Sequence, residues 1–92
     1  MATKKAHLTV RGQVQGVGYR FFVQKIAKKN GLAGWVKNKE DGSVEVTTEG
    51  EESLIETFIQ TLRTQHPWAK VDALEVEWAS CANEFHSFDI TY

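Results

Sequence analysis

Residues 6–31 read AHLTVRGQVQGVGYRFFVQKIAKKNG and predict the first three elements of the fold. In residues 6–14, apolar and polar side chains alternate, as in a strand that buries one face. A loop containing Gly16 and Gly18 follows, and apolar residues then recur every three or four positions as far as Asn30-Gly31, a typical helix C-cap. The stretch therefore predicts a strand, a glycine-bearing loop and a helix in direct succession.

The remainder of the chain continues the alternation of strands and helices. Asp41-Gly42, between two strand-like runs, is a strong hairpin signal. After Gly50 the apolar residues fall at helical spacing, and this second helix is expected to end before His66-Pro67. The later strands are expected over residues 32–38, 43–48, 71–79 and 88–92.

This element order predicts an α+β fold of the βαββαβ type with a short extra C-terminal strand. Two helices would pack on one face of an antiparallel sheet, which is the two-layer ferredoxin-like sandwich with right-handed crossovers. A chain of 92 residues is too short for a second core, so residues 1–92 are expected to form a single domain. The fold class alone assigns no function.

The composition disfavours several classes of partner. Lys and Arg total 11 against 12 Asp and Glu, a net charge of −1, and this balance disfavours nucleic acid and anionic membranes as partners. Cys81 is the one cysteine, so neither an internal disulfide nor a Cys-x-x-Cys metal site can form. No apolar stretch approaches the ~18 residues of a membrane span, and residues 1–7 carry charge without the apolar segment that a signal peptide would need. The cytoplasm is the expected location.

The loop from Gln15 to Arg20 is the most informative segment for function. Its glycines allow positive φ angles, the following helix supplies a positive N-terminus, and Arg20 can hold two phosphate oxygens at once. The pattern lacks the Lys-Ser/Thr of a Walker loop and the third glycine of a dinucleotide fingerprint. A phosphate cradle and a tight turn with a solvated arginine both fit it, and the turn is the commoner case.

Asn38, at the end of an expected strand, is the second candidate. Its carboxamide can accept a hydrogen bond from a water while donating to a ligand. An asparagine beside Glu40-Asp41-Gly42 is also ordinary turn chemistry.

Together these segments resemble the acylphosphatase family. The resemblance rests on GQVQGVGYR at residues 12–20, GWVKN at residues 34–38, the turn to Gly42 and FDITY at residues 88–92, and it extends over nearly the whole chain. Compared with animal members, Gly18 replaces a bulkier residue, and Lys39 stands where threonine is common. The Gly18-Tyr19-Arg20 sequence is more similar to bacterial and archaeal members.

The resemblance implies a small enzyme that hydrolyses the carboxyl–phosphate bond of acyl phosphates without metal or cofactor. The products would be a carboxylate and inorganic phosphate, and phosphate could also act as an inhibitor. Arg20 would be the catalytic arginine, and Asn38 the catalytic asparagine that positions the attacking water. The phosphate-binding residues would be Gln15, Gly16, Val17, Gly18, Tyr19 and Arg20. Independently of the resemblance, a monomer is expected, because the sequence shows no strong heptad pattern and no obvious exposed apolar stripe.

Two other functions remain open from the sequence. A binding module could hold phosphate in the same loop without turnover. RNA binding is a more distant alternative, because RNA-recognition domains share this element order but use exposed aromatic residues and a basic surface. Here the outward-facing strand positions include Glu45, Glu75 and Glu77.

Expectations for the remaining conspicuous residues are structural. The histidines, His7, His66 and His86, show no metal-ligand spacing and are expected to be exposed or structural. Most of the Trp and Phe side chains are expected in the core. The α-carboxylate of Tyr92 is expected near the loop, where it would hold Arg20 in orientation.

Overall fold

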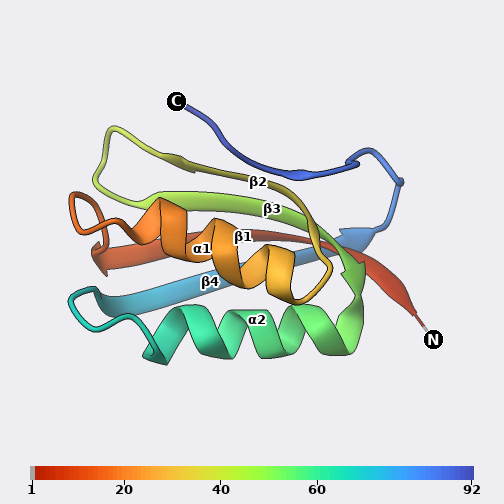
Figure 1. Cartoon of the computed structure of the whole chain (residues 1–92), viewed down its shortest axis with the longest axis horizontal. Helices are drawn as coiled ribbons and strands as arrows, with labels where there is room; N and C mark the ends of the chain where they lie inside the picture. Colours follow the sequence, from red (N-terminus) through yellow and green to blue (C-terminus); the bar gives the residue numbers. More distant parts are fainter. Residues whose placement is uncertain (1) are drawn as a thin grey trace.

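The chain folds into two helices packed on one face of a five-stranded sheet (Figure 1). The computed structural model describes residues 2–92. The elements are β1 (Thr3–Gln13), α1 (Tyr19–Lys29), β2 (Ala33–Asn38), β3 (Val44–Glu51), α2 (Glu52–Thr64), β4 (Lys70–Ser80) and β5 (Phe88–Ile90). The predicted ferredoxin-like order with a short extra strand is confirmed.

The expectation of an antiparallel sheet is wrong for its last strand. The strand order is β4-β1-β3-β2-β5, and β5 runs parallel to β2, with Phe88 opposite Gly34 and Ile90 opposite Val36. The reason is where β4 ends. Because β1 runs antiparallel to β4 and parallel to β2, β4 finishes at the end of the sheet where β2 begins. Residues 81–87 cross the sheet at that end, so β5 starts beside the start of β2.

The core lies between the sheet and the helices, and it fixes the strand register. Leu8 in the middle of β1 is fully buried and lies opposite Val46 on β3 and Val76 on β4. Since a slip of one residue would turn the buried face of β1 toward solvent, the core sets where β1 and β2 end. The helices contribute Tyr19, Val23 and Ala27 from α1, and Ile55, Phe58, Ile59 and Leu62 from α2.

The expectation that most Trp and Phe side chains lie in the core is wrong. Phe58 and Phe88 are buried, but Phe21 and Trp68 are largely exposed and Trp78 is partly so. Phe21 falls between the buried positions of α1, and Trp78 lies on β4, an edge strand with neighbours on one side only. These aromatic side chains are therefore surface residues.

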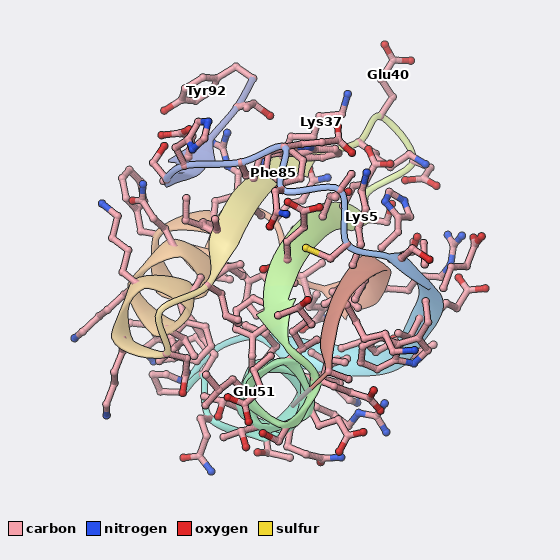
Figure 2. The ribbon with its side chains drawn as sticks, turned by 90° about the vertical axis from the view of Figure 1, so that its right-hand side faces the viewer. Lys5, Lys37, Glu40, Glu51, Phe85 and Tyr92 are labelled. Carbon is pink, nitrogen blue, oxygen red and sulfur yellow. The ribbon has the colours of Figure 1, made fainter. Side chains whose placement is uncertain are left out.

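The second face of the sheet carries no helix. Figure 2 shows Lys5, Lys37 and Phe85 on this side, opposite α1 and α2. The segment 81–87 crosses the face and is held by the buried Glu49, whose carboxylate accepts hydrogen bonds from the N–H groups of Ala82 (2.8 Å) and Glu84 (2.9 Å). Neither helix within residues 2–92 is both long enough and apolar enough to cross a bilayer.

Candidate active site

The loop after β1, the end of β2 and the last residues of the chain meet at one end of the sheet (Figure 1). The topology explains this meeting. Since β1 and β2 both pair antiparallel with β3, they run in the same direction and end on the same side. The glycine-bearing loop that ends at Arg20 and the strand end at Asn38, the two candidates from the sequence, therefore lie at the same end of the sheet.

The loop uses two glycines in the left-handed region to turn into α1. The φ angles are +77° at Gly16 and +74° at Gly18, values that residues with a side chain rarely adopt. Gly18 is the N-cap of α1, and its carbonyl accepts from the N–H of Phe22 (3.1 Å). The first turn of α1 carries no acidic side chain. The positive N-terminus of α1 is therefore open to an anion from outside the helix.

A cavity of about 130 Å³ lies at this N-terminus. Its lining residues are Val14, Gly16, Gly18, Tyr19, Arg20, Phe21 and Asn38. Of the predicted site residues, Gln15 and Val17 do not line it. Val14 and Phe21 were missed by the sequence reasoning. Both have the apolar character of core residues, and the only signal for Phe21 is its position directly after Arg20.

Arg20 is half-buried and is held by the last two residues of the chain. Its Nη1 donates to the carbonyl oxygen of Thr91 (3.3 Å), and its Cζ lies 4.7 Å from the ring centroid of Tyr92. Within residues 2–92, no carboxylate forms an ion pair with Arg20. The contacts that orient the guanidinium are thus a carbonyl and an aromatic ring, rather than the expected carboxylate of Tyr92. Its positive charge remains available to a bound anion.

Asn38 brings a buried acceptor to the same cavity. It is the last residue of β2 and lies opposite Val44 on β3, so the sheet fixes its backbone. Its Oδ1 is buried and has no hydrogen-bond partner in the described part of the chain. A buried polar atom without a partner is destabilising by roughly 1–3 kcal/mol and is uncommon in folded proteins. This acceptor is suited to a water or a ligand in the cavity.

Acid–base groups contribute little to the cavity. No His, Cys, Asp or Glu among residues 2–92 lines it. The hydroxyl of Tyr19 donates to the carbonyl oxygen of Leu62 (2.8 Å), and burial raises the pKa of Tyr19 far above neutrality. The arrangement can bind an anion and orient a water, but it offers no protein group to take a proton at neutral pH.

A larger cavity of about 440 Å³ lies on the open face of the sheet. Lys5, His7 and Trp35 are among its lining residues, and neither Arg20 nor Asn38 reaches it. Size does not identify the site, since another open cavity, of about 540 Å³ and bordered by Asn38 but not by Arg20, is larger still. The cavity of about 130 Å³ is lined by both Arg20 and Asn38 at the helix N-terminus, so we assign the chemistry there.

The histidines have the structural or exposed settings expected from the sequence. The ring of His7 lies between Thr47 Oγ1 (2.8 Å from Nδ1) and Glu45 Oε2 (3.0 Å from Nε2). The Nδ1 of His66 accepts from the N–H groups of Trp68 (3.1 Å) and Ala69 (2.9 Å). His86 is exposed.

Comparisons with known proteins agree with this geometry. A family model described as Acylphosphatase matches residues 6–90. The acylphosphatase of Bacillus subtilis is 42% identical over 85 residues, which cover 92% of this chain and 93% of its own length. That of Geobacillus thermodenitrificans is 42% identical over 89 residues, covering 97% and 95% respectively.

A solved structure extends the similarity to three dimensions. The crystal structure of acylphosphatase from Bacillus subtilis superimposes with a TM-score of 0.93 at 40% identity, covering 97% of this chain and 99% of that one. The similarity thus spans sequence and fold over almost the full length. The chain belongs to the acylphosphatase family.

Proposed function

We propose that this chain hydrolyses acyl phosphates, with Arg20 and the loop backbone binding the phosphate and Asn38 positioning the attacking water. Membership of the acylphosphatase family supports the reaction. One observation carries the residue assignment: Arg20, the N-terminus of α1 and Asn38, whose Oδ1 is buried without a partner, line one cavity of about 130 Å³.

Phosphate binding follows from the charges at the cavity. The backbone N–H groups from Gln15 to Arg20, together with the N-terminus of α1, would surround the phosphate oxygens. The planar guanidinium of Arg20 adds a bidentate contact. Inorganic phosphate should therefore bind as both product and competitive inhibitor.

Catalysis would depend on orientation and charge stabilisation. In a loose phosphoryl-transfer transition state, negative charge spreads over the equatorial oxygens, where the N–H dipoles and Arg20 act. Oδ1 of Asn38 would accept from a water and hold it in line with the departing carboxylate. As the water oxygen bonds to phosphorus, the bond from phosphorus to the acyl oxygen breaks and its electrons leave with the carboxylate.

The water's proton must also be placed. Since no acidic or basic side chain within residues 2–92 lines the cavity apart from Arg20 and the neutral Tyr19, we assign the proton to a phosphate oxygen of the substrate. The carboxylate is a good leaving group and needs no general acid.

The acyl group and the cellular setting complete the proposal. The cavity recognises phosphate, and the acyl group would project past the exposed Phe21 at its rim, so several acyl phosphates are expected to be substrates. The net charge of −1 disfavours a nucleic-acid or membrane partner, and the single cysteine suits the cytoplasm. The absence of a heptad pattern from the sequence favours a monomer.

The test is phosphate release from benzoyl phosphate in excess chelator. We expect Arg20→Ala to raise KM and lower kcat, and Asn38→Ala to lower kcat about 100-fold with a smaller change in KM, because misplacing a reacting group has an effect of that order. Asn30→Ala is the matched control, since the Asn30 side chain bonds to Ile26 O at the opposite end of α1.

The outcomes separate the enzyme from a binding module. Release no faster than spontaneous hydrolysis, with phosphate binding retained, would establish the binding module instead. Full kcat in Asn38→Ala would disprove the water-positioning role alone.

A further inference from the structure

The side chain of Gln15 connects the phosphate loop to the turn that follows Asn38. Its Nε2 donates one hydrogen bond to the carbonyl oxygen of Lys39 and one to that of Ser43, each 2.8 Å long. Both amide hydrogens are therefore used. Gln15 does not line the cavity, so these contacts are separate from the backbone role proposed above.

The turn that Gln15 holds is itself well ordered by internal hydrogen bonds. The N–H of Lys39 donates to Ser43 O (2.9 Å), and the N–H of Gly42 donates to Lys39 O (3.2 Å). The carboxylate of Asp41 accepts from both the N–H (3.0 Å) and the hydroxyl (2.6 Å) of Ser43. A turn closed in this way moves as one body, so holding its two carbonyls holds the strand end next to it.

The two ends of this connection are adjacent to the reacting groups. Gln15 immediately precedes Gly16, which lines the cavity at the phosphate loop, and Lys39 immediately follows Asn38. No sheet hydrogen bond joins β1 to β2, because β3 lies between them. The amide of Gln15 is a direct link between the loop that would bind phosphate and the strand end that would hold the water.

We propose that Gln15 is a positioning residue that sets the place of Asn38, and hence of the attacking water, relative to the bound phosphate. The inference rests on the proposed function of Arg20 and Asn38. Removing the amide leaves the N–H groups of the loop and Arg20 in place, so phosphate binding should persist. Turnover should fall, because in-line attack requires the water at a defined distance and angle.

The experiment uses Gln15→Met, which keeps the length of the side chain and removes its donors, with Gln15→Ala as a second variant. We expect kcat for benzoyl phosphate to fall at least 10-fold while the inhibition constant of inorganic phosphate stays within about twofold of the wild type. Gln13→Ala is the matched control, since Gln13 is an exposed glutamine two positions earlier at the end of β1. It should show wild-type kinetics.

A double-mutant cycle separates positioning from general stabilisation. If Gln15 acts through Asn38, Gln15→Met should lower kcat much less in the Asn38→Ala background than in the wild type. An equal loss in both backgrounds would overturn the proposal, as would a weakening of phosphate binding with kcat unchanged. A wild type without turnover would overturn the proposed function and this inference with it, whereas an active wild type with a fully active Gln15→Met would overturn this inference alone.

Discussion

Gly18 combines a backbone role and a site role in one residue. Its left-handed φ allows the loop to enter α1, and its backbone borders the cavity at the helix N-terminus. A Cβ at Gly18 would meet no atom within 4 Å, so space is not what requires glycine there. The requirement is conformational, because an L-residue with a side chain is strained at this φ.

We therefore expect Gly18→Ala to destabilise the fold by about 1–2 kcal/mol and to weaken phosphate binding. Urea unfolding gives the first quantity, and inhibition by inorganic phosphate gives the second. Gly31→Ala is the control, since Gly31 has a similar φ of +68° and open space, but lies just beyond the far end of α1. Gly31→Ala should be destabilised to a similar extent, with unchanged inhibition by inorganic phosphate. If both variants bound phosphate equally weakly, the site role of Gly18 would be contradicted.

Individual residues differ in how well the sequence predicts their place. Arg20 and Asn38 could be singled out because their residue types and neighbouring motifs are chemically specific, and the structure brings them to one cavity. Phe21 could not, since an apolar residue beside a helix start looks the same whether it faces the core or the rim of a cavity. The contacts of the Gln15 side chain were also hidden, because they depend on the distance between two loops that are far apart in sequence.

At the scale of elements, the β2–β3 turn depends on the ionised form of Asp41. Hydrogen bonds from the Ser43 hydroxyl and N–H, with a smaller contribution from Arg11 at 3.4 Å, lower the pKa of Asp41 from its ordinary 3.8 to about 2. A pKa lowered in the folded state means that ionised Asp41 stabilises the fold above about pH 4. This contribution is lost as the pH falls from about 4 through about 2.

Asp41→Ala should therefore make the stability of the fold less dependent on pH in the acidic range. We expect the melting temperature of the wild type to fall more steeply between pH 4 and pH 2 than that of the variant, so that the gap between them narrows in acid. Circular dichroism melts over this range would measure it. Glu40→Ala, which removes the exposed neighbouring carboxylate, is the control. If the difference in melting temperature between the wild type and Asp41→Ala did not change with pH, the role assigned to Asp41 would be contradicted.

The last strand shows what a sequence pattern leaves undetermined in an element. The alternation of Phe88 and Ile90 predicts a strand with one buried face, but it is identical for parallel and antiparallel pairing. Direction is set by where residues 81–87 cross the sheet, and that segment is held by the buried carboxylate of Glu49. In the sequence, Glu49 is one more acidic residue near the end of a strand.

For the molecule as a whole, core and site occupy largely different regions, although Val14 and Tyr19 belong to both. The apolar layer lies between the sheet and the helices. The cavity lies where β1 and β2 finish. These two strands finish at the same end of the sheet (Figure 1). A net charge of −1 is compatible with anion binding, since the binding groups are local: one guanidinium and one helix terminus. Stability and substrate recognition should therefore be separable by mutation.

Phe58 and Phe21 provide this separation. Phe58 is fully buried on α2, with its ring 6.3 Å from that of Phe88, whereas Phe21 is 64% exposed and borders the cavity. Truncating a buried phenylalanine destabilises by about 3–5 kcal/mol, and each kcal/mol lowers the melting temperature of a domain this small by roughly 4–8 °C. Phe58→Ala should thus melt more than about 10 °C lower, with KM for benzoyl phosphate unchanged at a temperature where it remains folded.

Phe21→Ala should do the reverse, changing KM a few-fold while its melting temperature stays close to that of the wild type. The reason is that an exposed side chain loses little burial on truncation, whereas its ring at the cavity rim contacts whatever projects from the bound phosphate. Thermal melts and steady-state kinetics on the two variants test both halves. A shift of KM in folded Phe58→Ala would show that the core controls the shape of the site, and the separation of the two regions would then be wrong.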